Sequence, residues 1–299
     1  DRLSYVDNHA AKSGTPTMGG LAFVISAVAC SLMFSSGSSS LALMLSMLTL
    51  GFGLIGFLDD FIKVFFKQNK GLSPWQKMLF QFLVALVIAF FVYYSPFVGD
   101  KVYVPFTMRE ISLGWFAVPF YVFVFIAFTN AVNLTDGLDG LAGKTSVAYT
   151  VFFAAVLSVI IYRFGVSAAY AEEYYNMLVL CMALIGALCG FLLFNSYPAA
   201  IFMGDTGALA LGGALAGLAV MSKLSLIAPI IGIMYVVSCV SDIIQVAHYK
   251  RTKRRVFLMA PFHHHLERKG IHENKIVSLY TLVTFFVGAV TLIIILALN

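Results

Sequence analysis

Charged residues are scarce in this sequence. They make up 11% of its 299 residues, whereas hydrophobic residues make up 61%, and the mean hydropathy is +0.92. A soluble globular domain carries about a quarter charged residues, so this composition excludes a soluble protein and indicates an integral membrane protein.

Cysteine is scarce as well, with four residues and no CxxC pair. All four lie inside or at the edge of apolar runs, where cysteine packs as a small apolar residue, so we expect neither a disulfide framework nor a cysteine metal site. The apolar runs also lack the alternation of polar and apolar residues that a transmembrane β-barrel requires.

What the sequence does have is a series of long apolar runs. Each contains about 16–23 residues, enough for a helix to cross about 30 Å of hydrocarbon. We predict an all-α, polytopic transmembrane helical bundle with nine spans, forming one integral-membrane domain over residues 1–299. The predicted spans cover residues 18–34, 41–58, 78–94, 115–133, 141–162, 177–194, 206–221, 224–244 and 276–298.

The basic residues are distributed unevenly between the loops. If the chain starts in the cytoplasm, the outside loops hold only four of the 19 Lys and Arg residues, namely Lys101, Arg109, Arg163 and Lys223. The positive-inside rule therefore favours this orientation. The net charge of +5 follows topology and contact with anionic membrane lipids, and no nucleic-acid partner is expected.

Five aspartates gather at the predicted helix ends on the cytoplasmic side. They are Asp59, Asp60, Asp136, Asp139 and Asp205. Carboxylates beside a bilayer are costly and usually functional. Together with the basic loops, they indicate Mg²⁺-dependent phosphate chemistry in a cytoplasmic active-site cleft.

Asp59 and Asp60 are predicted to end the second span. A helix C-terminus carries partial negative charge, so a neighbouring cation must offset this pair. The partner of the pair is either Lys63, one turn further on, or a divalent ion or a substrate phosphate cluster. Asp205, by contrast, starts an inside-to-outside span, where it either caps the helix or binds a metal opposite the pair.

The segment 130–140 separates the fourth and fifth spans and is rich in polar groups. Asn130, Asn133, Asp136 and Asp139 supply hard oxygen and amide groups, and Gly137 permits close approach of a ligand. The alternative is a polar turn in which Asp139 caps the next helix.

The longest cytoplasmic loop, residues 248–275, contains three adjacent histidines, His263, His264 and His265. Their spacing does not match the HExxH zinc motif. A zinc site is the alternative, but adjacent residues on a helix point about 100° apart and cannot all bind one ion, so we expect contacts with phosphate or a leaving group. Gln245 can add a polar contact from the helix that enters this loop.

These motifs together resemble the polyprenyl-phosphate N-acetylhexosamine-1-phosphate transferases. The resemblance rests on Asp59-Asp60 and on residues 14–20, 130–141, 194–207 and 261–265. The strings GTPTMGG and MAPFHHH are similar to the branch that makes the first lipid-linked precursor of peptidoglycan.

The resemblance implies a reaction between UDP-N-acetylmuramoyl-pentapeptide and undecaprenyl phosphate, with UMP leaving and Mg²⁺ required. It also implies a bacterial inner (plasma) membrane protein with a cytoplasmic active site that forms a homodimer. The family usually has ten spans, so we expect its first helix to be absent from this sequence.

The resemblance also assigns roles to individual residues. Asp59, Asp60, Asp205, His263 and His264 are implied to be catalytic, with Asp205 as the Mg²⁺ ligand and one member of the Asp59–Asp60 pair as a candidate base. Substrate is implied to contact Lys12, Thr17, Lys77, Asn130, Asn133, Asp136, Gly137, Asp139, Asn195, Phe202, Gln245 and His265, and Phe202 is implied to stack on uracil.

Two alternatives remain at this point. A sister transferase that uses UDP-N-acetylglucosamine would share the aspartate motifs but should lack the three histidines. A secondary transporter would carry charges in the middle of its spans and paired repeats, whereas these aspartates lie at helix ends.

Overall fold

The computed structural model describes residues 14–36, 40–67, 71–163 and 167–298. The elements in chain order are α2 (Gly20–Phe34), α3 (Ser40–Phe65), α4 (Pro74–Tyr93), β1 (Lys101–Tyr103), β2 (Glu110–Ser112), the 3-10 helix η1 (Gly114–Phe116), α5 (Ala117–Thr135), α6 (Leu141–Arg163), α7 (Ala168–Asn195), α8 (Gly204–Met221), α9 (Ala228–Ile231), α10 (Ile233–Thr252), α11 (Phe262–Arg268) and α12 (Glu273–Ala297).

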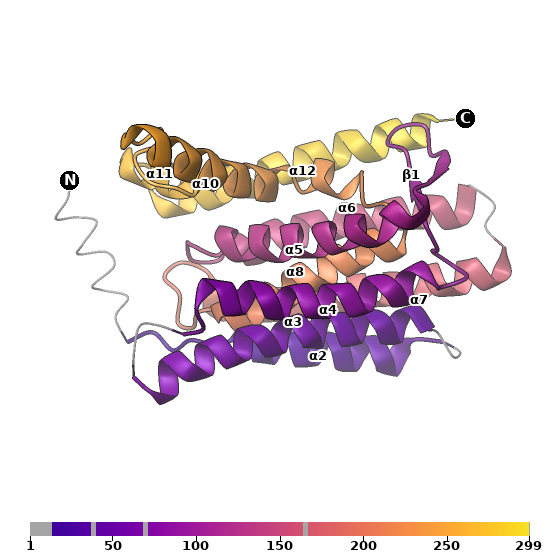
Figure 1. Ribbon diagram of the computed structural model, residues 1–299, viewed down its shortest axis with the longest axis horizontal. Helices are drawn as coiled ribbons and strands as arrows, with labels where there is room; N and C mark the ends of the chain where they lie inside the picture. Colours follow the sequence, from indigo (N-terminus) through magenta and orange to yellow (C-terminus); the bar gives the residue numbers. More distant parts are fainter. Residues whose placement is uncertain (1–13, 37–39, 68–70, 164–166, 299) are drawn as a thin grey trace.

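The long helices lie side by side along the longest axis of the molecule, with α11 at one end and β1 at the other (Figure 1). Seven of the described helices are long and apolar enough to cross a membrane. The predicted polytopic helical bundle is therefore confirmed. Side chains such as Leu282 and Phe286 on α12 are 66% and 69% exposed, as expected for a helix face that contacts lipid.

The seven spanning helices are fewer than the nine predicted spans, for two physical reasons. Helix α2 has only 15 residues, about 22 Å at 1.5 Å per residue. The predicted span 224–244 is broken at Gly232 into α9 and α10. Pro229 in α9 lacks a backbone donor, and α10 continues to Thr252 through the charged residues Lys250 and Arg251.

The prediction of an all-α fold missed a short antiparallel hairpin. In it Val102 on β1 pairs with Ile111 on β2. The hairpin is fixed by Lys223, whose backbone carbonyl accepts from Tyr103 N at 2.8 Å and whose Nζ lies 2.7 Å from Glu110 Oε1. Residues from separate predicted outside loops thus meet at the end of the bundle opposite α11.

Helix α8 forms the centre of the bundle and packs against α2, α3 and α5. Its residues from Thr206 to Met221 are buried. Close approach depends on Gly56 of α3, because a Cβ at this position would lie 2.1 Å from the backbone oxygen of Asp205. Since Gly56 precedes Asp60 by one helical turn, this contact brings Asp205 beside the acidic pair of α3.

The predicted end of the second span is wrong. Helix α3 continues to Phe65, so Asp59 and Asp60 lie inside its last two turns instead of at its end. Both side chains are buried, at 1% and 3% exposure. Their charge therefore has to be compensated by specific partners.

Candidate active site

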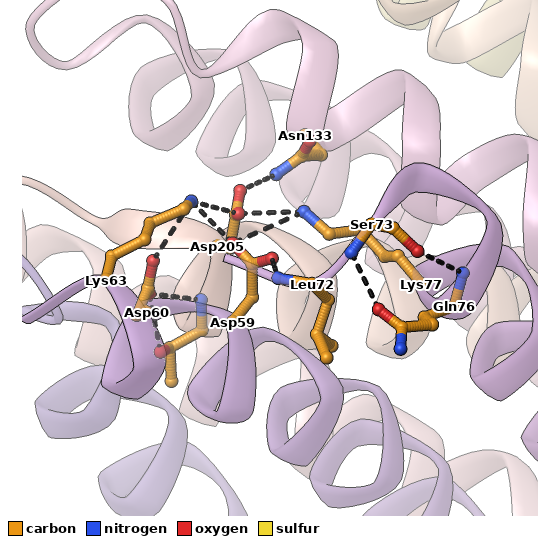
Figure 2. A network of polar contacts seen from close by, with 10 residues as sticks. Asp59, Asp60, Lys63, Leu72, Ser73, Gln76, Lys77, Asn133 and Asp205 are labelled. Atoms are coloured by element: carbon orange, nitrogen blue, oxygen red, sulfur yellow. Dashed lines mark hydrogen bonds and ion pairs between the residues drawn. The ribbon is translucent and has the colours of Figure 1, made fainter. Parts of the chain in front are cut away.

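Three carboxylates converge at the end of the bundle where α3 meets the start of α8 (Figure 2). One oxygen from each of Asp59, Asp60 and Asp205 lies within 4.8 Å of the other two. The prediction that Asp205 faces the Asp59–Asp60 pair is confirmed.

Asp205 is held from both sides. Its Oδ2 lies 2.8 Å from Lys63 Nζ and 2.9 Å from Lys77 Nζ, and its Oδ1 accepts a hydrogen bond from Asn133 Nδ2 at 2.7 Å. The carboxylate also lies in the first turn of α8, where the helix dipole stabilises an anion. The metal-ligand interpretation of Asp205 thus fits its position, whereas the helix-cap interpretation does not, because its oxygens contact Lys63, Lys77 and Asn133 and not the N–H groups of α8.

Asp60 provides the hydrogen bonds that cap α8. Its Oδ2 accepts from Thr206 N at 2.9 Å and from Thr206 Oγ1 at 2.7 Å. A carboxylate that accepts from the first turn of a helix satisfies otherwise unpaired donors. Asp60 therefore joins α3 to α8, a role that the sequence did not indicate because the two residues are 146 positions apart.

Asp59 joins α3 to the segment that precedes α4. Its Oδ1 accepts from Leu72 N at 2.8 Å, and its Oδ2 lies 2.5 Å from Lys63 Nζ and 3.5 Å from Lys77 Nζ. Lys63 is thus the cationic partner that the sequence suggested for the acidic pair, and Lys77 is a second.

The carboxylate oxygens of this cluster are suitable ligands for a magnesium ion. At Mg–O distances of 2.0–2.1 Å, the ligand oxygens of an octahedral site lie about 3.0–4.2 Å apart. The three carboxylate oxygens lie within 4.8 Å of one another, so they must draw slightly closer to bind one Mg²⁺ together. Carboxylates are also the ligand type that Mg²⁺ prefers.

A cavity of about 500 Å³ adjoins the acidic cluster, within the size range of small-molecule sites. Nine of the predicted site residues line it. The full lining consists of Thr17, Asp60, Lys63, Asn133, Asp136, Gly137, Leu138, Asp139, Asn195, Phe202, Met203, Gly204 and Asp205.

The motif at residues 14–20 holds one wall of this cavity. Phe202 N donates to Pro16 O at 2.8 Å, and Gly19 N donates back to Phe202 O at 2.9 Å. This backbone pairing fixes Phe202 beside Thr17, and both residues line the cavity. Lys12, from the same predicted motif, lies outside the described residues.

Asp136 lies just past the end of α5, outside the spanning segments. Burial raises the pKa of its carboxyl to about 7, and the nearby carboxylates of Asp205, Asp60 and Asp139 add to this effect. Asp136 can therefore exchange a proton near neutral pH at the wall of the cavity.

Asp139 and Asn195 join loops that come from different parts of the chain. Asp139 Oδ2 accepts from Ala199 N at 3.0 Å, and Asp139 N donates to the carboxylate of Glu273 at the start of α12. Asn195 accepts from Gly140 N at 3.2 Å and donates to Ile201 O at 2.8 Å. The structure thus gives both residues a role in positioning the cavity wall. The sequence did not indicate Glu273.

Two of the three histidines approach the cavity wall. A Cβ at Gly137 would lie 2.3 Å from His263 Nε2 and 3.0 Å from His264 Nε2, so the predicted need for glycine at this position has a physical basis. His263 is fully buried, and its burial lowers the pKa of the imidazole to about 3. His263 is therefore neutral. His264 Nδ1 lies 2.9 Å from Glu267 Oε2.

Three other predicted residues do not line the cavity. His265 Nδ1 accepts from Leu258 N at 3.1 Å. Gln245 binds the same loop, since its Oε1 accepts from Val256 N and Phe257 N at 3.0 Å. Asn130 donates to Gln81 Oε1 at 2.7 Å between α5 and α4. These contacts stabilise the scaffold and do not place the three side chains at the cavity.

Comparison with known proteins identifies the family. The family model of glycosyl transferase family 4 matches residues 42–223, and signature 1 of phospho-N-acetylmuramoyl-pentapeptide-transferase matches residues 12–24. Curated relatives of that name include one from Clostridium novyi (strain NT), 44% identical over 93% of this chain and 82% of its own length. A second is from Caldanaerobacter subterraneus subsp. tengcongensis and is 46% identical over 92% of this chain and 83% of its own length. A third is from Thermoanaerobacter sp. (strain X514) and is 47% identical over 93% of this chain and 83% of its own length. The chain therefore belongs to glycosyl transferase family 4 and, within it, to the phospho-N-acetylmuramoyl-pentapeptide-transferases.

Proposed function

We propose that this chain transfers phospho-N-acetylmuramoyl-pentapeptide from its UDP-linked donor to undecaprenyl phosphate, which forms lipid I and releases UMP. The observation that carries this proposal is the cluster of Asp59, Asp60 and Asp205 with two lysines beside a cavity of about 500 Å³. Phosphoryl transfer depends on positioning and on stabilisation of negative charge, and this cluster has the groups for both.

The cavity wall is formed by residues from four segments, and its side chains suit the donor nucleotide. Phe202 offers an aromatic face for uracil, and Thr17 and Asn133 offer polar groups. Lys63 lines the same cavity, so its ammonium can reach the diphosphate of a bound donor. The imidazoles of His263 and His264 can hydrogen-bond the transferred group or the leaving phosphate, and neutral His263 does so without adding positive charge.

Asp205, with Asp59 and Asp60, would hold Mg²⁺. The ion, when bound, neutralises charge on the diphosphate and polarises the transferred phosphoryl group. Among the carboxylates, Asp60 is engaged by Thr206, and Asp59 by Leu72 N and Lys63. Asp136, which lines the cavity and has a pKa raised to about 7, is therefore the stronger candidate for accepting a proton from the lipid phosphate.

The membrane orientation follows from the loops. Lys63 lies in the last turn of α3, Lys77 in the first turn of α4 and the three histidines on α11. The positive-inside rule assigns these helix ends to the cytoplasm, so we propose nine spans in a bacterial plasma membrane with a cytoplasmic cleft. The spans 18–34 and 224–244 would then cross as a short helix and a broken helix. A homodimer remains a prediction.

A donor-exchange assay tests the function. Purified protein should release UMP from UDP-N-acetylmuramoyl-pentapeptide only when undecaprenyl phosphate and Mg²⁺ are both present. UMP release from UDP-N-acetylglucosamine but not from the muramoyl donor would reject the proposal and favour the sister transferase. Phe202→Ala should raise the Kd of UMP about tenfold through loss of stacking, and an unchanged Kd would remove Phe202 from the nucleotide site.

A further inference from the structure

One ammonium group contacts all three carboxylates of the acidic cluster. Lys63 Nζ lies 2.5 Å from Asp59 Oδ2, 2.8 Å from Asp205 Oδ2 and 3.8 Å from Asp60 Oδ1 (Figure 2). These are the residues whose oxygens could together hold a metal ion. Lys63 is thus bound to the ligand set that a divalent cation would need.

An ammonium and a divalent cation compete for these oxygens. Both are positive, and a pair of cations a few ångströms apart in a partly buried site repel by several kcal/mol. A metal bound at about 2.1 Å to the oxygens that accept from Lys63 at 2.5–2.8 Å would lie within a few ångströms of the ammonium. Repulsion between the two cations therefore favours movement of Lys63 away from the carboxylates when a metal binds.

We propose that Lys63 is the built-in counter-ion of the metal-free site and that a divalent cation displaces its ammonium into the adjoining cavity. This inference rests on the proposed metal site. In the displaced position, Lys63 becomes a cationic ligand for the donor diphosphate. One event thereby completes the metal site and supplies a second positive charge to the substrate.

Lys63 is better suited to this exchange than Lys77. Lys77 contacts Asp205 and Asp59 but has no contact with Asp60 among those described, and it does not line the cavity. The Lys63 side chain is 35% exposed, against 20% for Lys77. Its flexible four-carbon stem can therefore carry the ammonium from the carboxylates to the cavity that it already lines.

The counter-ion also has a purpose before the metal arrives. Without a cation, buried Asp59 and Asp60 together with Asp205 would repel one another. Lys63 keeps them together in a geometry close to that of a metal site. It does so at a cost in metal affinity, because the metal must replace an existing contact.

Amine labelling of the full-length protein in detergent tests the displacement directly. Mn²⁺ serves as the probe cation, and peptide mass spectrometry measures how fast each lysine reacts with an N-hydroxysuccinimide ester. We expect Mn²⁺ to raise the labelling rate of Lys63 about threefold or more, because an amine released from the three carboxylates is more accessible to the reagent. Lys67, one turn further along the chain and exposed, is the internal control and should change little.

Mn²⁺ affinity, measured by electron paramagnetic resonance, gives the second readout. Lys63→Met should bind Mn²⁺ about tenfold more tightly than the wild type, since a competing charge is gone. Lys67→Met removes the same charge without touching the carboxylates and should stay within about twofold.

The outcomes separate the two proposals. Unchanged Lys63 labelling, or unchanged or weaker Mn²⁺ binding in Lys63→Met, contradicts the displacement while leaving the metal site intact. Failure of the wild type to bind Mn²⁺, or binding that survives Asp205→Asn undiminished, contradicts the metal site and the displacement together.

Discussion

Asp60 on α3 accepts hydrogen bonds from both the backbone N–H and the hydroxyl of Thr206 on α8. This contact fixes the start of the central helix and, with it, the position of Asp205. Asp60 therefore has a structural role in addition to the chemical role suggested by its place beside the cavity.

Two variants separate these roles. Asp60→Ala leaves the two buried Thr206 donors without an acceptor, at a cost of about 1–3 kcal/mol, and should lower the Tm by several degrees. Asp60→Asn keeps an amide oxygen for the Thr206 N–H and should retain most of the Tm while turnover falls. Thermal unfolding in detergent gives the Tm of both variants, and the UMP-release assay gives their turnover. A wild-type Tm in Asp60→Ala would contradict the capping role.

Gly56 controls how closely α3 and α8 approach. Gly56→Ala places a methyl group 2.1 Å from the backbone oxygen of Asp205, so α8 must shift, and we expect a loss of about 3 kcal/mol together with weaker Mn²⁺ binding. Gly186→Ala on α7 is the matched control, since a Cβ there meets nothing within 4 Å. Equal stability of the two variants would show that the approach of these helices is not tight.

Asp136 makes stability depend on pH. Its folded-state pKa is raised from 3.8 to about 7, so the unfolded chain ionises first and the ionised carboxyl costs folding stability as pH rises from about 4 to 7. Asp136→Asn should therefore stabilise the metal-free protein by up to about 4 kcal/mol at pH 8, and by roughly a third of that at pH 5. Thermal melts at the two pH values check this, and a gain that is larger at pH 5 would have the wrong sign.

Glu273 is predicted to position the cavity wall through the backbone of Asp139. Glu273→Ala removes the acceptor and should raise the KM for the UDP-linked donor about tenfold, with a smaller change in kcat. Glu273→Gln retains an acceptor oxygen and should stay within about threefold of wild type. Steady-state kinetics distinguish them, and equal effects of Ala and Gln would rule out this hydrogen bond as the cause.

The sequence predicted the features that depend on local composition. Apolar run length predicted the membrane helices, and the interruptions by aspartate and asparagine predicted where the site residues would gather. These properties depend on transfer of each segment into lipid and can be derived from one segment at a time.

Features that depend on distant partners could not be predicted. Helix α3 continues beyond Asp60 because Thr206 and Lys63 compensate the acidic pair, so the charges do not end the helix. The link from Glu273 to Asp139 joins positions 134 residues apart. Such contacts arise from packing between helices, which a single sequence does not reveal.

The fate of the donor's two phosphates tests the central claim most directly. The protein is incubated with undecaprenyl phosphate, Mg²⁺ and UDP-N-acetylmuramoyl-pentapeptide labelled at either phosphorus, and lipid and aqueous products are separated. We predict that the sugar-proximal phosphate enters the lipid fraction in wild type, that the other phosphate leaves as UMP, and that Asp205→Asn abolishes both. Release of the sugar-proximal phosphate into water, or full transfer by Asp205→Asn, would contradict the account.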